Sequence, residues 1–255
     1  MGWWNNFFTA RTVEGPSLVI LIEELQPFFG KTPVEITGAA KLDYDRLRKK
    51  RVLNFKSWGK HFLIVFDGFY IRIHFLMFGS YRINGVKEDR VPKLSMTFKD
   101  GFVNFYTCAV SMFEGNPDDV YDYSVDVMSD TWNATKALKT LKPRSNEMVC
   151  DSLLDQNVFA GSGNIIKNEV LYRVGLHPES RIGALKPKQL KAMIDETRNY
   201  SLEFYALKKK NQLSRNWKIF KKKICKTCEG PVELRHTGKL DRRSFMCNRC
   251  QALVV

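Results

Sequence analysis

Residues 155–178 read DQNVFAGSGNIIKNEVLYRVGLHP. The pattern predicts that one helix ends near Ala160 and that the next begins after the turn Gly161-Ser162-Gly163. Glycine has no Cβ, so this turn allows the backbone to pass close to a ligand. With Asn164 as the N-cap, free N–H groups and the positive helix end would face an anion, most naturally a DNA phosphate.

The character of the chain changes on either side of this segment. Between about residues 33 and 128, short β-rich runs are separated by turn signals such as Asp67-Gly68 and Asn84-Gly85, without an intervening helical pattern. Such a series predicts an antiparallel sandwich or barrel. Apolar residues at helical spacing predict helices over 17–28, 131–140, 145–158, 164–174 and 187–207.

These patterns together predict an α+β protein. Its N-terminal part is an antiparallel β-sandwich with an N-terminal helix, and its C-terminal part is helical. The hinge is expected around residues 128–145. Short strands around the cysteines over residues 215–255 add a small zinc module.

Four of the six cysteines form two C-x-x-C pairs, Cys225/Cys228 and Cys247/Cys250, with 18 residues between the pairs. Two such knuckles on facing hairpin ends give a closed S4 site, which suits one structural Zn²⁺ and leaves no open position for catalysis. The alternative is a pair of disulfides or chance pairing. His236 lies between the pairs and is left out, because four sulfurs saturate the metal.

The charge of the chain is positive and uneven. Its 255 residues carry 41 Lys and Arg against 27 Asp and Glu, a net charge of +14. Residues 1–150 contribute +3 and residues 151–255 contribute +11. This favours a polyanionic partner, nucleic acid before acidic membrane, over a merely solvated surface. The basic run 205–226, together with Arg242 and Arg243 near the hairpin tip, fits a phosphate-tracking surface.

Neither a membrane span nor a secretory signal is expected. The longest apolar runs, such as Leu18–Ile22, have five residues, against roughly 20 for a spanning helix. The first residues, MGWWNNFFTAR, lack the basic and apolar regions of a signal peptide.

Four motifs occur in order: V-E-G-P at Val13–Pro16, W-G-K at Trp58–Lys60, H-x-x-M-x-G at His74–Gly79, and the D-Q…A-G-x-G-N-I block followed by the cysteine pairs. In these motifs the chain resembles the bacterial formamidopyrimidine-DNA glycosylase/endonuclease VIII family, the helix–two-turn–helix (H2TH) glycosylases of base excision repair. The resemblance covers about residues 13–252. It implies an extension over 1–12, a catalytic β-sandwich over 13–130, an H2TH domain over 131–214 and a zinc finger over 215–255.

The resemblance also implies a mechanism. Family members flip a damaged base out of DNA, and an N-terminal amine attacks C1′ of the sugar, expels the base and forms an imine. β- and δ-elimination then follow. By position, Val13 would supply the amine, in a valine-first variant, and Glu14 would be the acid/base beside it.

The DNA contacts follow from the same resemblance. Lys60, Asn164 and Arg242 would contact phosphates near the lesion, with Gly163 in the turn before Asn164. Met77 would wedge into the gap left by the flipped base.

Each of these residues has a structural alternative. Glu14 is also explained as a charge at a helix N-terminus, and Lys60 as a surface lysine. Met77 in an apolar strand is also typical of a core residue. His74 is interpreted as a structural histidine.

Twelve residues precede Val13, and an amide nitrogen is not a nucleophile, because its lone pair is delocalised. Three explanations stay open: a true start at position 12, cleavage after Thr12, or loss of the lyase chemistry. If the extension stays, Trp3, Trp4, Phe7 and Phe8 are expected to crowd the pocket mouth.

The leading hypothesis is therefore a glycosylase for oxidised bases with AP lyase activity. The alternatives are a catalytically impaired binder of damaged or abasic DNA on the same fold, and a zinc-ribbon RNA- or ribosome-binding protein. The expected partner is damaged DNA, the expected state a monomer, and the expected location the bacterial cytoplasm at the nucleoid. The V-E-G-P start favours oxidised pyrimidines and hydantoins, whereas His74–Gly79 favours formamidopyrimidines.

Overall fold

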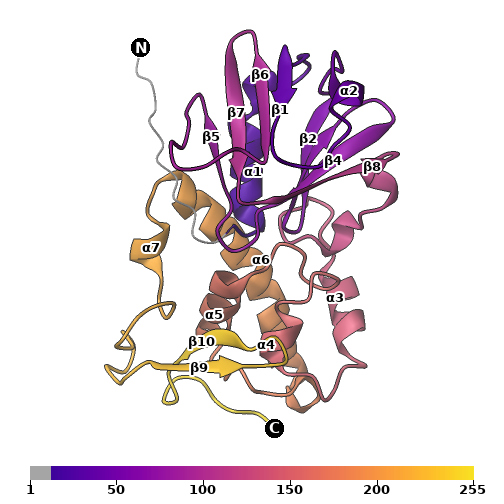
Figure 1. Ribbon diagram of the computed structural model, residues 1–255. Helices are drawn as coiled ribbons and strands as arrows, with labels where there is room; N and C mark the ends of the chain where they lie inside the picture. Colours follow the sequence, from indigo (N-terminus) through magenta and orange to yellow (C-terminus); the bar gives the residue numbers. More distant parts are fainter. Residues whose placement is uncertain (1–12) are drawn as a thin grey trace. The chain divides into compact units, whose positions relative to one another are not determined.

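The computed structural model describes residues 13–255, shown in Figure 1. They form two compact units. The β unit comprises Val13 and Leu21–Tyr121, and the helical unit comprises Glu14–Ile20 and Asp122–Val255. The predicted extension, with its four large aromatic residues, lies outside the described residues.

The first helix, α1 (Gly15–Glu24), contributes residues to both units. It is followed by a 3₁₀ turn, η1 (Gln26–Phe28), in which Pro27 lies near the start. The predicted N-terminal helix is confirmed, but the α-helical part ends three residues before Pro27. Proline has no N–H group, so Pro27 cannot donate the next α-helical hydrogen bond, which agrees with this early end.

The β unit contains two four-stranded antiparallel sheets, with strand orders β1-β6-β7-β5 and β2-β3-β4-β8. Apolar side chains pack between the sheets; the rings of Phe62 in β3 and Phe105 in β7 have centroids 5.8 Å apart. This confirms the predicted antiparallel sandwich. The strands are β1 (Glu35–Thr37), β2 (Asn54–Trp58), β3 (His61–Val65), β4 (Phe69–His74), β5 (Ser80–Ile83), β6 (Leu94–Phe98), β7 (Gly101–Tyr106) and β8 (Ala109–Glu114), with short helical turns α2 (Tyr44–Leu47) and η2 (Pro117–Asp119).

The helical unit is built around α5 and α6, which pack against each other, as Figure 1 shows. Its core includes Val170 and Leu171 of α5 and Met193 and Phe204 of α6, all at most 1% exposed. The helical elements are η3 (Tyr123–Val125), α3 (Ala134–Leu141), α4 (Val149–Ser152), α5 (Asn164–Arg173), η4 (Ile182–Ala184), α6 (Pro187–Lys209) and α7 (Leu213–Asn216).

One predicted helix is wrong in extent. Of residues 145–158, only α4 is helical. The polar side chains that follow α4 bond to nearby backbone instead: the N–H of Asn157 donates to Oδ1 of Asp155, and Nε2 of Gln156 donates to the carbonyls of Leu154 and Ser162. Such local bonds compete with the helix and produce turns.

The last part of the helical unit is a hairpin of β9 (Glu233–Thr237) and β10 (Arg242–Met246). Arg242 is paired with Thr237 and Met246 with Glu233. The predicted cysteine-flanked strands are therefore confirmed. Among the described residues, none of the helices has the length and apolar character that crossing a bilayer requires.

Candidate functional site

The carboxylate of Glu14 lies at the N-terminus of α5. Glu14 is 1% exposed. Its Oε1 accepts from the N–H of Ile165 at 2.8 Å, and its Oε2 accepts from the N–H of Ile166 at 3.2 Å. The first four N–H groups of a helix have no partner within the helix, and a carboxylate there also meets the positive end of the helix dipole. Glu14 therefore complements the N-terminus of a helix about 150 positions further along the chain.

This arrangement corrects the interpretation of the glycine turn. Gly163 precedes α5 as its N-cap residue, and Asn164 is the first helical residue rather than the cap. The N–H groups of Ile165 and Ile166 are occupied by Glu14 and do not face solvent. A Cβ on Gly163 would lie 2.4 Å from Cδ of Glu14, so this glycine makes room for the carboxylate. Gly161 has a φ of +94°, which favours glycine for its backbone conformation.

Asn164 sits beside this carboxylate at the start of α5. Its carbonyl accepts from Nδ2 of Asn168 at 2.7 Å. Its side-chain Oδ1 is buried and has no hydrogen-bond partner among residues 13–255. Buried polar atoms without a partner are uncommon in folded proteins and often mark functional positions.

The hairpin carries Arg242 at the start of β10, where its side chain is exposed. The turn before it is attached to α4, because Asp151 accepts from the N–H of Lys239 with Oδ1 at 2.9 Å and Oδ2 at 3.1 Å. A Cβ on Gly238, which has a φ of +73°, would collide with the same carboxylate.

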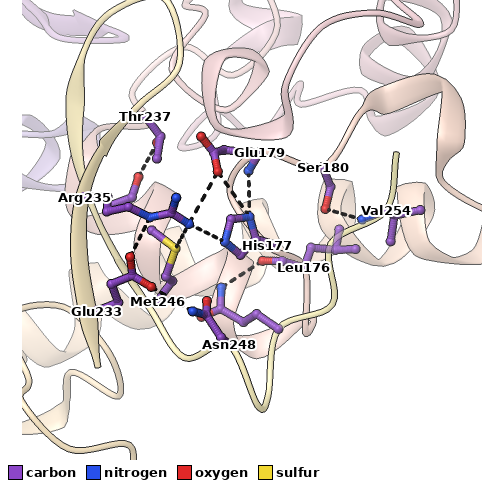
Figure 2. Close-up of polar contacts among 12 residues, drawn as sticks. Leu176, His177, Glu179, Ser180, Glu233, Arg235, Thr237, Met246, Asn248 and Val254 are labelled. Carbon is purple, nitrogen blue, oxygen red and sulfur yellow. Dashed lines mark hydrogen bonds and ion pairs between the residues drawn. The ribbon is translucent and has the colours of Figure 1, made fainter. Parts of the chain in front are cut away.

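The hairpin is also tied to the segment after α5 through Arg235 of β9, as Figure 2 shows. Arg235 pairs with Glu233 at 2.8 Å and with Glu179 at 3.5 Å, and its Nη2 lies 3.3 Å from Nε2 of His177. His177 is 5% exposed, and burial lowers its pKa, so the ring is neutral near pH 7. These contacts fix the hairpin on the helical unit.

The four cysteines converge at the base of the hairpin, where their sulfurs all lie within 4.8 Å of one another. The Sγ atoms of Cys225 and Cys250 are 3.7 Å apart, and those of Cys228 and Cys247 are 3.4 Å apart. A tetrahedral site with bonds of about 2.3 Å places its ligand sulfurs roughly 3.8 Å apart. The cluster therefore fits a metal ion. His236 lies outside it and contacts Asp241.

In the β unit, Lys60 lies in the two-residue turn between β2 and β3, after Gly59 with a φ of +58°. His74 ends β4 opposite His61. Burial lowers the pKa of His74, and the charges of Lys60 and Arg72 lower it further. A neutral, half-buried ring agrees with the structural interpretation of His74.

Met77 projects from the turn between β4 and β5. It is 57% exposed, so its interpretation as a core residue is wrong. Leu76 and Phe78 beside it are 53% and 66% exposed, and sequence analysis missed both. The turn itself is fixed: Phe75 is 1% exposed, and a Cβ on Gly79 would lie 1.8 Å from the carbonyl oxygen of Phe75. The H-x-x-M-x-G spacing was the available signal for this turn.

Val13 is half-buried and directly precedes Glu14. The helical unit therefore brings together Glu14, Gly163 and Asn164, and the hairpin next to α5 carries Arg242. Lys60 and Met77 lie in turns of the β unit.

Comparison with known proteins agrees with this architecture. Residues 124–212 match the model of the formamidopyrimidine-DNA glycosylase H2TH domain. Endonuclease 8-like 3 of Mus musculus is 32% identical over 204 residues, which cover 77% of this chain and 34% of that protein. Endonuclease 8-like 2 of Bos taurus is 32% identical over 197 residues, which cover 71% of this chain and 58% of that protein.

The chain belongs to the formamidopyrimidine-DNA glycosylase/endonuclease VIII family. It spans about a third of the length of the Endonuclease 8-like 3 relative. A viral DNA glycosylase shares the family fold with a TM-score of 0.82 at 18% identity, over 94% of this chain and 100% of that one. The Lactococcus lactis formamidopyrimidine-DNA glycosylase bound to DNA containing an AP site also shares the fold. Its TM-score is 0.82 at 20% identity, and the match covers 93% of this chain and 99% of that chain.

These relatives correct one expectation. A bacterial, nucleoid-associated location is wrong, because this chain is similar to Endonuclease 8-like proteins of vertebrates, among them Mus musculus, Xenopus laevis and Bos taurus. The sequence motifs report on a fold and its chemistry, and neither depends on the compartment.

Proposed function

We propose that this chain is a base-excision-repair DNA glycosylase for oxidised bases with AP lyase activity. The observation that carries the proposal is the buried carboxylate of Glu14, which follows Val13 and is held by the first-turn amides of α5. An acid/base group must be held in place to act on a sugar. Here the H2TH segment itself holds it.

In the proposed reaction, the α-amine of Val13 attacks C1′ of the damaged nucleotide. The bond from C1′ to the base breaks, and the base leaves with the bonding electrons and takes up a proton from solvent. The Glu14 carboxylate accepts the proton that the attacking amine loses and then donates it to the ring oxygen as the sugar opens to a protonated imine on the Val13 nitrogen. Loss of a proton from C2′ then expels the 3′ phosphate by β-elimination, and δ-elimination expels the 5′ phosphate.

This mechanism needs an amine at Val13, whereas the printed sequence joins Val13 to Thr12 by a peptide bond. Borohydride trapping on abasic-site DNA tests the point with two proteins: the printed chain and a chain starting Met-Val13, from which methionine is removed. The proposal expects covalent trapping of the shorter chain alone. Trapping of neither, with retained binding to abasic DNA, would favour the alternative of a non-catalytic binder on the same fold.

We further propose that the protein acts on damaged DNA as a monomer. Its sandwich, H2TH and zinc-finger parts would span residues 13–130, 131–214 and 215–255. The proposed DNA contacts are Lys60, Asn164, Arg242 and Met77. Because each released counterion adds to the salt dependence, Arg242→Ala should weaken binding and lower the slope of log affinity against log salt by about one. An unchanged slope would reject the phosphate contact.

The metal in this proposal is one structural Zn²⁺ bound by Cys225, Cys228, Cys247 and Cys250. The hairpin is too small to have its own core, so metal binding would supply much of its folding free energy. One zinc per chain is expected from elemental analysis of the purified protein. Cys228→Ser should reduce the zinc content and the affinity for DNA together.

A further inference from the structure

Two polar residues of α5 are buried against the hairpin. Lys167 is 0% exposed and Asn168 is 1% exposed. Lysine is almost never fully buried unless its ammonium is paired. Both residues lie within about one turn of Asn164, on a helix that packs against β10.

The buried ammonium of Lys167 is hydrogen-bonded to β10. Its Nζ donates to the carbonyl of Arg243 at 3.1 Å and to Oγ of Ser244 at 2.8 Å. The hydroxyl of Ser244 is also 2.6 Å from Oγ1 of Thr237 on β9. One cation thus connects α5 to both strands at the end of the hairpin that carries Arg242.

Asn168 makes a second connection at the same place. Its Oδ1 accepts from the N–H of Phe245 at 2.7 Å. Its Nδ2 donates to the carbonyl of Asn164 at 2.7 Å and to that of Arg243 at 3.3 Å. The carbonyl next to Arg242 therefore receives two donors, and one of the two side chains also holds the backbone of Asn164.

A buried lysine is costly. Burial lowers the pKa of Lys167 to about 8, and the neighbouring guanidinium of Arg242 lowers it too, against the opposing effects of Cys150, Asp151 and Glu14. An apolar side chain such as methionine would fill the space without the desolvation penalty. Costly polar groups are most often retained at functional positions.

We propose that Lys167 and Asn168 are positioning residues. They fix the backbones of Arg242 and Asn164 relative to each other, so that both side chains can contact the phosphates of one DNA strand. The inference rests on the proposed function, because it takes these two residues as phosphate contacts. Lys167 acts on Arg242 through the backbone of β10 and touches no phosphate itself.

A double-mutant cycle tests this coupling. Affinity for duplex DNA with a stable abasic-site analogue is measured by fluorescence anisotropy across a KCl series for wild type, Lys167→Met, Arg242→Ala and the double variant. Arg242→Ala should lower the salt slope by about one. Lys167→Met should weaken binding about 10-fold and lower the slope by no more than Arg242→Ala does, because it weakens the same phosphate contact. The double variant should bind within about 2-fold of Arg242→Ala alone, because the two residues act as one unit.

The matched control is Lys191→Met, which removes an equal charge from the exposed pair of Lys191 with Asp195. It should leave affinity nearly unchanged. Independent, additive effects of Lys167→Met and Arg242→Ala would overturn the inference, as would full affinity in Lys167→Met. If Arg242→Ala itself has no effect, the phosphate contact of the proposed function fails as well.

Folding is checked by zinc content and thermal unfolding of each variant. If Lys167→Met loses its zinc or unfolds, Ser244→Ala replaces it, because that change removes one of the two acceptors of the ammonium and keeps the lysine. The same cycle with Arg242→Ala then applies, with the same non-additive result expected. Additivity would again reject the coupling.

Discussion

Gly163→Ala is the sharpest perturbation of the site. Gly163 has φ −133° and ψ −164°, an extended conformation open to alanine, so the backbone itself opposes no substitution. The added Cβ would lie 2.4 Å from Cδ and 2.5 Å from Oε1 of Glu14. Carbon atoms in contact are about 3.5–4.0 Å apart. The carboxylate must therefore move by about 1 Å.

Such a movement breaks the bonds from Ile165 and Ile166 to the carboxylate, which are 2.8 Å and 3.2 Å long. Hydrogen bonds to a charged group contribute roughly 1.5–3 kcal/mol each. The expected loss in the free energy of unfolding is thus about 3 kcal/mol or more, measured by urea denaturation. If Glu14 is the acid/base, excision should also fall by about 100-fold or more.

The decisive comparison is the same substitution in a Glu14→Ala background, where the carboxylate is gone. There Gly163→Ala should change stability by less than about 0.5 kcal/mol. Gly85→Ala is the matched control, because its Cβ would meet only ordinary contacts at 3.8 Å or more. Equal destabilisation by Gly163→Ala in both backgrounds would refute the steric argument.

Three further changes are predicted. Glu169→Gln should lower stability by about 2 kcal/mol in urea denaturation, because the buried carboxylate accepts the N–H groups of Lys218, Ile219 and Phe220, and an amide –NH₂ would face one of them. Met77→Ala should change the melting temperature little but weaken binding to abasic DNA, since its side chain is 57% exposed. Between pH about 8 and 10.5 the unfolded chain keeps the Lys167 proton while the native protein loses it. The stability of wild type relative to Lys167→Met should therefore rise with pH, by about 2 kcal/mol between urea denaturations at pH 7.5 and 9.5.

The features that the sequence predicts correctly, the sandwich and the cysteine cluster, are set by local patterns. Strands separated by Asp67-Gly68 and Asn84-Gly85 form an antiparallel sandwich because turn chemistry and alternation act over a few residues. The cysteine spacing predicted the cluster for the same reason. The failure at residues 145–158 is also local, since the side chains of Asp155 and Gln156 favour turns over a continued helix.

The contacts between distant segments could not be read from spacing. Glu14 and Ile165 are 151 positions apart, and Lys167 and Ser244 are 77 apart. Gly163 was assigned to the close approach of a ligand, whereas its missing Cβ accommodates a side chain of the protein. A glycine requirement is visible in sequence, but the group that occupies the space is set by tertiary packing. Lys167, which stands among apolar residues of the predicted helix over 164–174, is a sequence signal of such a contact.

The same geometry governs how Glu14→Gln must be interpreted. Glutamine retains one acceptor oxygen, which can keep the 2.8 Å bond from Ile165, but its –NH₂ would then face the N–H of Ile166. The variant therefore loses the proposed proton donor and also about 1–2 kcal/mol of stability. Excision assays should be run well below its melting temperature, with binding to abasic DNA as the measure of folding. Loss of excision with retained binding would assign Glu14 to the chemistry, whereas excision equal to that of wild type would leave the carboxylate with only its role at the N-terminus of α5.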